Sequence, residues 1–401
     1  MPGFTELQWQ AIDQEIRNNP RRYGMPIRRN HSVVIGSFNA LKLGKARNTD
    51  KRWEFLGRFV SRFDLLAIQE VMDDLSGVRR LHESFGSGFR LVVSDTTGAF
   101  PGDRGLRERL AFFYRPSRIE LKELLSDITY DRSRIVRRLR EDIDTWRNFF
   151  LDIDRENEIR AQNNQRPKSL SDFAHPAFTT FIRTPHCASF SIRGRNGTEP
   201  IEFLGVNAHT LFGQSTEERN REFFALLDWV VQRAKSRDRM YSKNMIIMGD
   251  LKMHFDDAAN KLSEIILRLH QLNSNLLSGP NAARANFPFL DVHPDQQSLF
   301  STNARKNQTF DHVAFFIDRD EKGLPQTGSN ATAGQAGQAG QAGLNSYDYG
   351  VFDFAELFAQ SVRGVSFSAL TASQRNDLLD RAKADVSDHM PIWVRIPIPG
   401  A

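Results

Sequence analysis

The chain has 401 residues, enough for one large domain or for two or three smaller ones. Hydrophobic residues make up 40% and charged residues 26%, a composition that excludes a largely disordered chain. The 54 Lys and Arg against 49 Asp and Glu give a net charge of +5, which is compatible with a polyanionic partner without requiring one.

The lone cysteine, Cys187, excludes an internal disulfide and a cysteine-rich zinc site, so any metal must be held by oxygen and nitrogen. No run of about 18 apolar residues suggests a membrane span, and the first residues lack the apolar core of a signal peptide. We therefore expect a cytoplasmic, monomeric protein without a membrane span. The 31 Phe against 6 Tyr indicate a core filled by Phe.

Residues 1–30 form the first region of the chain. Thr5 and Gln8 match a capping box, and apolar residues recur on one face as far as Ile16, which predicts a short amphipathic helix. The helix should end by Pro20. The basic segment that follows is interpreted as a solvated connector.

Residues 31–398 alternate short apolar runs with amphipathic stretches, a pattern typical of an α/β fold whose sheets are covered by helices. The runs predicted as buried strands are VVIGSF, LLAIQEV, RLVVSD, LAFFYR, IEFLGVNAH, MIIMGD, FDHVAFF and MPIWVRI.

Two stretches interrupt this alternation. Residues 131–165 carry apolar side chains every three or four positions and predict a long helix docked by its apolar stripe. Its arginines are interpreted as a solvated face, with a clamp on a nucleic-acid backbone as the alternative: Arg134, Arg137, Arg138 and Arg140. Residues 327–343 repeat GQA without a large apolar residue and predict a flexible surface loop.

Polar side chains with catalytic or metal-binding chemistry follow the ends of several predicted strands. Because loops at strand ends gather side chains that are distant in sequence, we expect them to share one cleft. Their chemistry suits phosphodiester hydrolysis: carboxylates bind a hard cation such as Mg²⁺, and a His held by a carboxylate acts as an acid or base near neutral pH. These residues are Asn39, Glu70, His209, Asp250, Asp311 and Asp388.

At these positions the chain resembles the DNase I-like endonuclease/exonuclease/phosphatase superfamily, in ordered motifs over roughly residues 32–397. Each motif alone is weak, and their joint order makes the resemblance specific. The matching segments are SFNALKLG, AIQEV, RERLAFFYR, VNAHT, MGDLK, TFDHVAF and SDHMPIW.

The resemblance implies a four-layer α/β sandwich, with two mixed sheets packed face to face and helices outside. It implies that Glu70, Asn39 and Asp388 lie at a Mg²⁺ or Mn²⁺ site. The catalytic residues that it implies are Asp250, or His389 oriented by Asp311, to activate water, and His209 oriented by Glu108 to assist at the phosphate or leaving group. The phosphate-binding residues that it implies are Asn207, Lys252 and His312.

Lys252 departs from the family pattern, which has Asn two residues after the Asp. A Lys could contact the scissile phosphate through its charge, or it could crowd or repel the metal. The sequence therefore predicts a metal-dependent phosphodiesterase. The first hypothesis is a nuclease that acts on DNA or RNA. Two alternatives stay open, a phosphatase or phospholipid phosphodiesterase of the same fold and a catalytically impaired phosphate-binding module. Arg183 is expected on the surface, and Cys187 is expected to be buried and inert.

Overall fold

The structure is a computed structural model, and it places most of the chain. The expected loop 327–343 lies outside the residues that it describes. The described residues are 3–44, 51–96, 107–169, 173, 176–178, 180–210, 216–236, 240–253, 267, 270–276, 282–290, 299–321, 323–325 and 349–401.

In the described part of the chain, twelve strands form two six-stranded mixed sheets. In the first, with the order β11-β12-β1-β2-β4-β3, β1 and β2 are parallel and all other neighbours are antiparallel. The second has the order β5-β6-β7-β8-β10-β9, and only β7 and β8 are parallel. The strands of the first sheet are β1 (Ser32–Leu43), β2 (Leu65–Met72), β3 (Arg90–Val93), β4 (Glu108–Tyr114), β11 (Tyr349–Val351) and β12 (Ile392–Pro397). Those of the second are β5 (Ile119–Asp127), β6 (His186–Ile192), β7 (Ile201–His209), β8 (Met245–Asp250), β9 (Ala283–Asn286) and β10 (Asp311–Asp318).

The two sheets pack face to face on a core rich in Phe. Strands β1, β2 and β4 of the first sheet contact β7, β8 and β10 of the second. Across the interface the rings of Phe112 and Phe190 meet edge to face, with centroids 5.3 Å apart. Among the described residues, eleven of the twelve largest fully buried side chains are Phe. The prediction of a Phe-filled core is confirmed.

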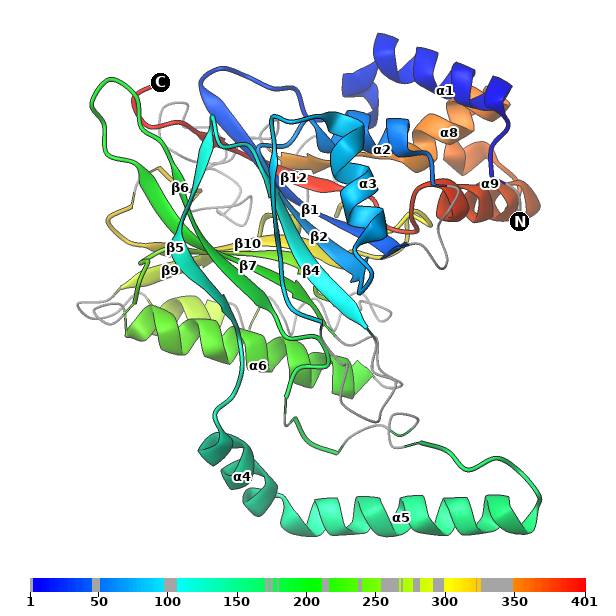
Figure 1. The fold of residues 1–401 in the computed structure, drawn as a ribbon, viewed down its shortest axis with the longest axis vertical. Coiled ribbons are helices and arrows are strands. Elements are labelled where there is room, and N and C mark those ends of the chain that lie inside the picture. The colour runs from blue at the N-terminus through cyan, green and yellow to red at the C-terminus, as the bar shows by residue number, and fades with distance from the viewer. Residues whose placement is uncertain are drawn as a thin grey trace.

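Helices cover both outer faces, so the predicted four-layer α/β sandwich is confirmed (Figure 1). On the second sheet lies α6 (Thr216–Lys235), whose Phe223, Leu226 and Val230 are buried against strand residues. No helix in the described part of the chain is long and apolar enough to cross a bilayer. The helices on the first sheet are α1 (Glu6–Asn18), α2 (Trp53–Val60), α3 (Ser76–Phe85), α8 (Phe354–Arg363) and α9 (Ala372–Asp385).

The N-terminal helix α1 belongs to this helical layer. Its capping box has both hydrogen bonds, from the Gln8 backbone to the Thr5 hydroxyl and from the Thr5 backbone to the Gln8 side chain. Trp9 lies edge to face against Phe358 of α8 at 5.8 Å. Residues 6–18 are thus packed on the core.

The insertion differs from its prediction. Residues 131–165 form two helices, α4 (Arg132–Glu141) and α5 (Ile143–Gln162), which are separated at Asp142. They stand away from the sandwich (Figure 1), and much of their apolar stripe stays exposed. Only Trp146 and Ile153 are buried, and Phe150 is 46% exposed. The prediction of one docked helix was therefore wrong, although the helical content was right.

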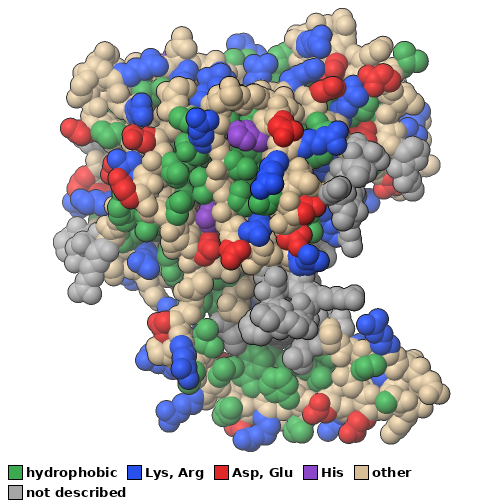
Figure 2. Space-filling view, viewed as in Figure 1, with side chains coloured by type: hydrophobic (Ala, Val, Ile, Leu, Met, Phe, Trp, Pro, Cys, Tyr) green, Lys and Arg blue, Asp and Glu red, His purple; other side chains and the backbone are tan. Residues whose placement is uncertain are grey.

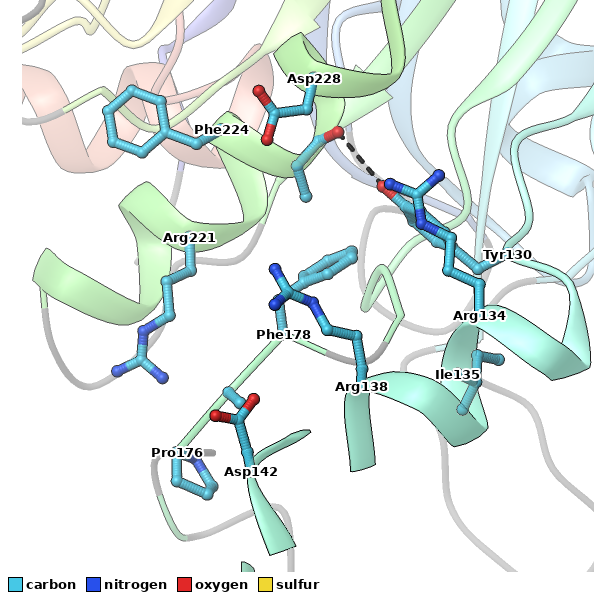
Figure 3. A pocket seen from close by; sticks show the side chains of 12 residues that line it. Tyr130, Arg134, Ile135, Arg138, Asp142, Pro176, Phe178, Arg221, Phe224 and Asp228 are labelled. Carbon is cyan, nitrogen blue, oxygen red and sulfur yellow. Dashed lines mark hydrogen bonds between the residues drawn. The ribbon is translucent and has the colours of Figure 1, made fainter. Parts of the chain in front are cut away.

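A hollow of about 370 Å³ lies between α4 and α6 (Figure 3). In the space-filling view, basic side chains gather over α4 at the lower left of the molecule (Figure 2). The insertion thus adds a basic surface at a distance from the sheets.

Candidate active site

Strand pairing brings the predicted site residues together. His209 ends β7 directly opposite Asp250 at the end of β8, and Asp250 is in turn opposite Asp311 at the start of β10. Three adjacent strands of one sheet therefore present these side chains at the same edge. Gly249 permits this close approach, because a Cβ there would lie 1.9 Å from the carbonyl oxygen of Ala208.

Irregular backbone directs Glu70 into the site. The β1–β2 register shifts between Asn39 and Leu43, and the β2–β4 register shifts between Ile68 and Val71. Such irregularities re-aim side chains next to functional sites. Glu70 has a left-handed φ of 57°, a conformation that costs a non-glycine residue on the order of 1–3 kcal/mol.

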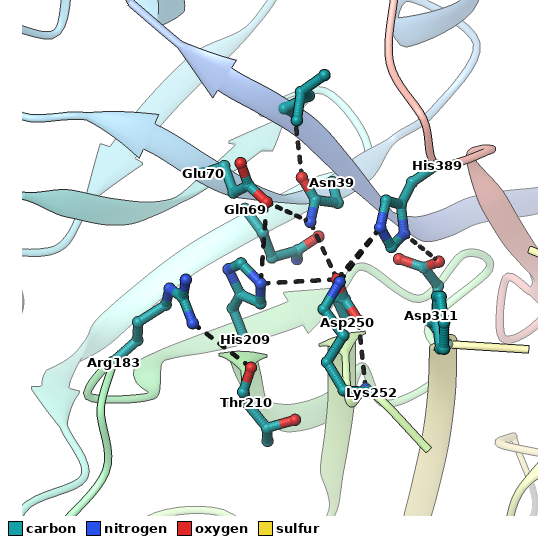
Figure 4. Close-up of polar contacts among 12 residues, drawn as sticks. Asn39, Gln69, Glu70, Arg183, His209, Thr210, Asp250, Lys252, Asp311 and His389 are labelled. Carbon is teal, nitrogen blue, oxygen red and sulfur yellow. Dashed lines mark hydrogen bonds and ion pairs between the residues drawn. The ribbon is translucent and has the colours of Figure 1, made fainter. Parts of the chain in front are cut away.

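The carboxylate of Asp250 is the centre of the site (Figure 4). Its Oδ2 accepts a hydrogen bond of 3.0 Å from Asn39 Nδ2 and forms an ion pair with Lys252 Nζ. The Nε2 atoms of His209 and His389 both lie 3.6 Å from the same oxygen. Asp250 is fully buried, and Lys252 with both histidines lowers its pKa against the opposing effect of burial.

The first histidine is held from the opposite sheet. His209 Nδ1 lies 3.5 Å from Glu108 Oε2, and Glu108 also forms a buried ion pair with Arg183. Burial raises the pKa of Glu108, but His209 and Arg183 outweigh it and hold the value at about 2. Burial and the Arg183 charge lower the pKa of His209, so its imidazole is neutral at pH 7.

The second histidine is also held from the opposite sheet. His389, just before β12, places its Nδ1 2.9 Å from Asp311 Oδ2. Burial lowers the pKa of His389, but Asp311 outweighs it and raises the value to about 9, against the opposing charge of Lys252. In its neutral form, with the proton on Nδ1, His389 accepts a hydrogen bond of 3.3 Å from Lys252 Nζ at its Nε2.

The site has an excess of negative charge beside Glu70. Its buried carboxylates are those of Glu70, Glu108, Asp250 and Asp311, and the cations bonded to them are Arg183, Lys252 and protonated His389.

Hydrogen bonds from Asn39 Nδ2 and from the Lys42 N–H, both 3.0 Å long, hold Glu70. With its proton on Nδ1, neutral His209 directs the lone pair of Nε2 at Glu70 Oε1, 4.0 Å away, and at Asp250 Oδ2. His209 Nε2, Glu70 Oε1 and Asp250 Oδ2 are thus three acceptors that face one another, an arrangement that suits a cation or a water molecule.

A second group could also hold a metal. The ligand atoms of Asp250, Asp311 and His389 lie within 4.8 Å of one another, and all three residues are buried. The Lys252 ammonium already contacts two of them. The donor chemistry therefore fits a divalent cation better on the Glu70 side of Asp250 than on the His389 side.

Four of the residues predicted from the motifs lie differently from what was expected. Asp388 pairs with Lys383 at 3.1 Å, and its side chain is 39% exposed, at the rim rather than beside Glu70. Asn207 donates both amide protons, to the carbonyls of Ile68 and Ala111, so it braces the two sheets and keeps no proton for a phosphate.

His312 contacts the carbonyl of Thr309 through Nε2 at 3.0 Å, and burial lowers its pKa to about 4. This side chain is bonded within its own loop rather than to the site. Asn39 likewise turns its amide nitrogen to the carboxylates, and its oxygen accepts the N–H of Leu41. It bridges Glu70 and Asp250 without offering an oxygen to a metal.

Sequence reasoning missed two basic residues. Arg183, expected on the surface, is buried beside Glu108, so that expectation was wrong. Lys51 is 3% exposed, donates to the carbonyl of Val386, and lies within electrostatic range of Glu70 and Asp388. Burial lowers its pKa to about 8. Neither residue lies in a motif that could have revealed it. Charge balance alone predicts that basic residues lie near so many acidic ones, without saying which.

No family model matches the chain, and no curated protein matches it. Solved structures do. An endonuclease/exonuclease/phosphatase family protein from Bacteroides thetaiotaomicron is 13% identical, with a TM-score of 0.40, over 92% of this chain and 98% of that one. Truncated TDP2 from Caenorhabditis elegans is 11% identical, with a TM-score of 0.42, over 91% and 97%. The human Nocturnin catalytic domain with bound sulfate is 12% identical, with a TM-score of 0.41, over 91% and 94%.

The description of the Bacteroides protein is that of the superfamily which the sequence motifs resemble. Another similar structure is a mannosyl-6-phosphatase from the same organism, 13% identical with a TM-score of 0.41 over 91% of this chain and 99% of that one.

Proposed function

We propose that the protein is a divalent-cation-dependent phosphodiesterase, and that its substrate is a nucleic acid. The observation that carries the proposal is the convergence of two carboxylate-held histidines on one buried carboxylate, with both Nε2 atoms 3.6 Å from Asp250 Oδ2. Such a pair supplies the two proton-transfer groups that hydrolysis of an ester needs.

Glu70 and Asp250 are the residues that would hold the cation, with water completing its coordination. A bound Mg²⁺ or Mn²⁺ would stabilise the negative charge that develops on the phosphoryl oxygens. Asn39 keeps both carboxylates in place through its amide nitrogen. This assignment keeps Glu70 from the motif analysis and adds Asp250. Asn39 remains a neighbour of the cation, whereas Asp388 pairs with Lys383 at the rim.

The two pKa directions assign different tasks to the histidines. Neutral His209 accepts a proton from the attacking water at Nε2, while Glu108 holds Nδ1. The water oxygen forms the new bond to phosphorus and the ester P–O bond breaks. Protonated His389, held by Asp311, gives its Nε2 proton to the departing alkoxide. These roles exchange those that the motif resemblance implies.

Lys252 contributes a fixed positive charge beside His389, where the leaving group would depart. The residue is 7% exposed, and its ammonium pairs with Asp250 and lies 5.1 Å from the centre of the Phe310 ring. The charge of Asp250 raises the pKa of Lys252 against burial, which keeps the ammonium protonated. A phosphate oxygen that enters the site can be bound by this charge.

One experiment separates the enzyme from its alternatives. Purified protein is incubated with plasmid, single-stranded DNA, RNA, a small chromogenic phosphodiester and phosphomonoesters, with Mg²⁺, Mn²⁺ or a chelator. We expect cation-dependent cleavage of a nucleic acid, and its loss in Glu70→Gln with an unchanged melting temperature. Hydrolysis of phosphomonoesters alone would favour the phosphatase. Full activity in Glu70→Gln would contradict the cation site.

A second function is favoured by one contact. Because the Lys252 ammonium already neutralises Asp250, the site could bind a phosphate without cleaving it. Binding of oligonucleotides without turnover under every cation condition, and a gain of turnover in Lys252→Asn, would identify such a binding module.

A further inference from the structure

Helix α4 is strongly basic and has no buried residue. Within its ten residues it carries one acidic residue, Glu141, and five arginines: Arg132, Arg134, Arg137, Arg138 and Arg140. A solvated face was the first interpretation of this pattern. The surroundings of two of these arginines indicate a binding surface instead.

Arg134 and Arg138 stand between two hollows. One, of about 370 Å³, lies between α4 and α6 and is also lined by Arg221 (Figure 3). The other, of about 430 Å³, is also lined by Arg137. The arginines therefore border a furrow, which we define by these two hollows, rather than a convex face.

Aromatic rings form part of the furrow wall. Tyr130, Phe178 and Phe224 line the first hollow. The guanidinium of Arg134 lies 4.5 Å from the centre of the Tyr130 ring, and the Tyr130 hydroxyl donates to the carbonyl of Ala225 at 3.2 Å. Tyr130 and Phe178 meet edge to face at 5.4 Å. These contacts hold the wall in place before any ligand binds.

The charge of the furrow favours an anion without being uniformly positive. Asp142 and Asp228 line the first hollow, and Arg138 pairs with Glu141 at 3.4 Å while 58% of its side chain stays exposed. Acidic residues among arginines restrict where a phosphate can sit. They also disfavour a continuous sheet of negative charge, such as a membrane surface, which would meet them together with the arginines.

We propose that this furrow binds single-stranded nucleic acid outside the catalytic centre, with phosphates on Arg134 and Arg138 and a base against the aromatic wall. Positive charge interleaved with aromatic rings is the chemistry of sequence-tolerant single-strand binding. This rests on the proposed function, which supplies the substrate class.

The chain segment that contains Phe178 links the furrow to the catalytic centre. Phe178 is followed a few residues later by Arg183, which pairs with Glu108. The N–H of Ile182 donates to Glu222 of α6 at 2.7 Å, next to Arg221 of the furrow. The furrow and the ion pair beside His209 are thus joined through one short segment of the chain.

Fluorescence anisotropy of the full chain with labelled DNA and RNA single strands of about 16 nucleotides, the upper size for one compact binding site, tests the furrow. Arg134→Ala/Arg138→Ala should weaken binding at least about tenfold. It should also reduce the slope of log K against log salt concentration by about 1.4, because each of two lost phosphate contacts contributes about 0.7. The matched control is Arg147→Ala/Arg155→Ala, which removes the same charge from exposed pairs with Asp144 and Asp152 on α5. The control should bind normally.

A conservative variant separates charge from ring contacts. Arg134→Lys/Arg138→Lys keeps both charges, so it should retain the salt dependence but bind several-fold more weakly, because Lys lacks the planar guanidinium. Equal weakening in the furrow variant and the α5 control, or none in either, would overturn the furrow. Binding to anionic vesicles that depends on Arg134 and Arg138, with no such dependence for oligonucleotides, would also overturn it.

Hydrolysis of a small chromogenic phosphodiester distinguishes failure of the furrow from failure of the proposed function. The furrow variant should cleave this small substrate at the wild-type rate while the KM for oligonucleotides rises. Oligonucleotide binding through Arg134 and Arg138 without any hydrolysis would overturn the enzyme and leave the furrow. Hydrolysis with unchanged oligonucleotide binding in the variant would overturn the furrow and leave the enzyme.

Discussion

The two histidine pairs of the site have the same construction and opposite protonation. In each pair a His from one sheet contacts a buried carboxylate from the other, and both histidines face Asp250. Yet the pKa of His209 is lowered, whereas that of His389 is raised to about 9. A carboxylate partner alone does not decide the state of a buried histidine.

The difference is a guanidinium. Arg183 pairs with Glu108, so the charge of that carboxylate is shared and the Arg183 charge itself disfavours an imidazolium at His209. Asp311 has no ion pair with Lys or Arg in the described part of the chain, and its carboxylate supports the imidazolium of His389. One pair is thus prepared to accept a proton and the other to give one.

The largest expected effect comes from the carboxylate that both pairs share. Asp250→Asn should lower turnover about 10³-fold, the upper range for loss of one preorganised polar group, since it removes a cation ligand and the common partner of both histidines. It should also destabilise the fold by about 3–5 kcal/mol, because it breaks the buried ion pair between Asp250 and Lys252. Rates and urea unfolding measure the two effects. The exposed Asp320→Asn is the control, and near-normal turnover in Asp250→Asn would remove Asp250 from the centre.

Removing either histidine should cost at least about 10²-fold in turnover, the usual contribution of a positioned acid or base. The pH–rate profiles should differ. A base acts when neutral, so His209 is expected to set the fall in rate at low pH. An acid acts when protonated, so His389 is expected to set the fall above about pH 9.

Accordingly, His209→Ala should lose the acidic limb and His389→Ala the alkaline limb, with His82→Ala, whose ring contacts the Phe89 carbonyl, as a control outside the site. Loss of the limbs in the reverse order would restore the roles that the motifs imply. Rate changes of only a few-fold in both variants would make these histidines structural.

Of the two histidines, His389 is the one that Lys252 contacts in the described part of the chain, and the effect of Lys252 should be about tenfold, in a direction that decides its role. If its charge binds the phosphate, Lys252→Ala lowers the rate and its salt dependence. If it hinders the cation, Lys252→Asn raises the rate and tightens cation binding, measured by titration calorimetry. In both variants the alkaline limb should move to higher pH, because Lys252 lowers the pKa of His389. An unmoved limb would show that the ammonium does not act on His389.

The sheets and the centre of the site were predictable, and the reason is local. Strands such as MIIMGD are apolar runs that end in a polar residue, so both their burial and the position of Asp250 are contained in a few letters. The insertion was not predictable in the same way. Its apolar spacing indicates helix, but whether Phe150 is docked depends on residues far away in sequence, and Phe150 stays 46% exposed.

Partners contributed by single residues were also out of reach. Arg183 lies in a segment with no periodicity, and only folding brings it to Glu108, 75 residues earlier in the chain. Asn207 illustrates the opposite error. Asn207 lies two residues before His209, so it belongs to the motif and, by the alternation of a strand, points to the same face as His209. There its amide donates to backbone carbonyls of the opposite sheet. A place in a motif indicates that a residue has a required role, and its hydrogen bonds show whether that role is structural or chemical.

Arg183 offers the smallest and most direct test of the difference between the pairs. Arg183→Met removes the charge that lowers the pKa of His209, so that pKa should rise and the acidic limb should move to higher pH, with a loss of a few-fold at pH 7. Arg183→Lys keeps the charge and should leave the limb near its wild-type position. NMR titration of His209 measures the pKa independently of turnover, and the alkaline limb set by His389 should stay fixed in both variants. If Arg183→Met shifts both limbs equally, or neither, the guanidinium is not what distinguishes the two histidines.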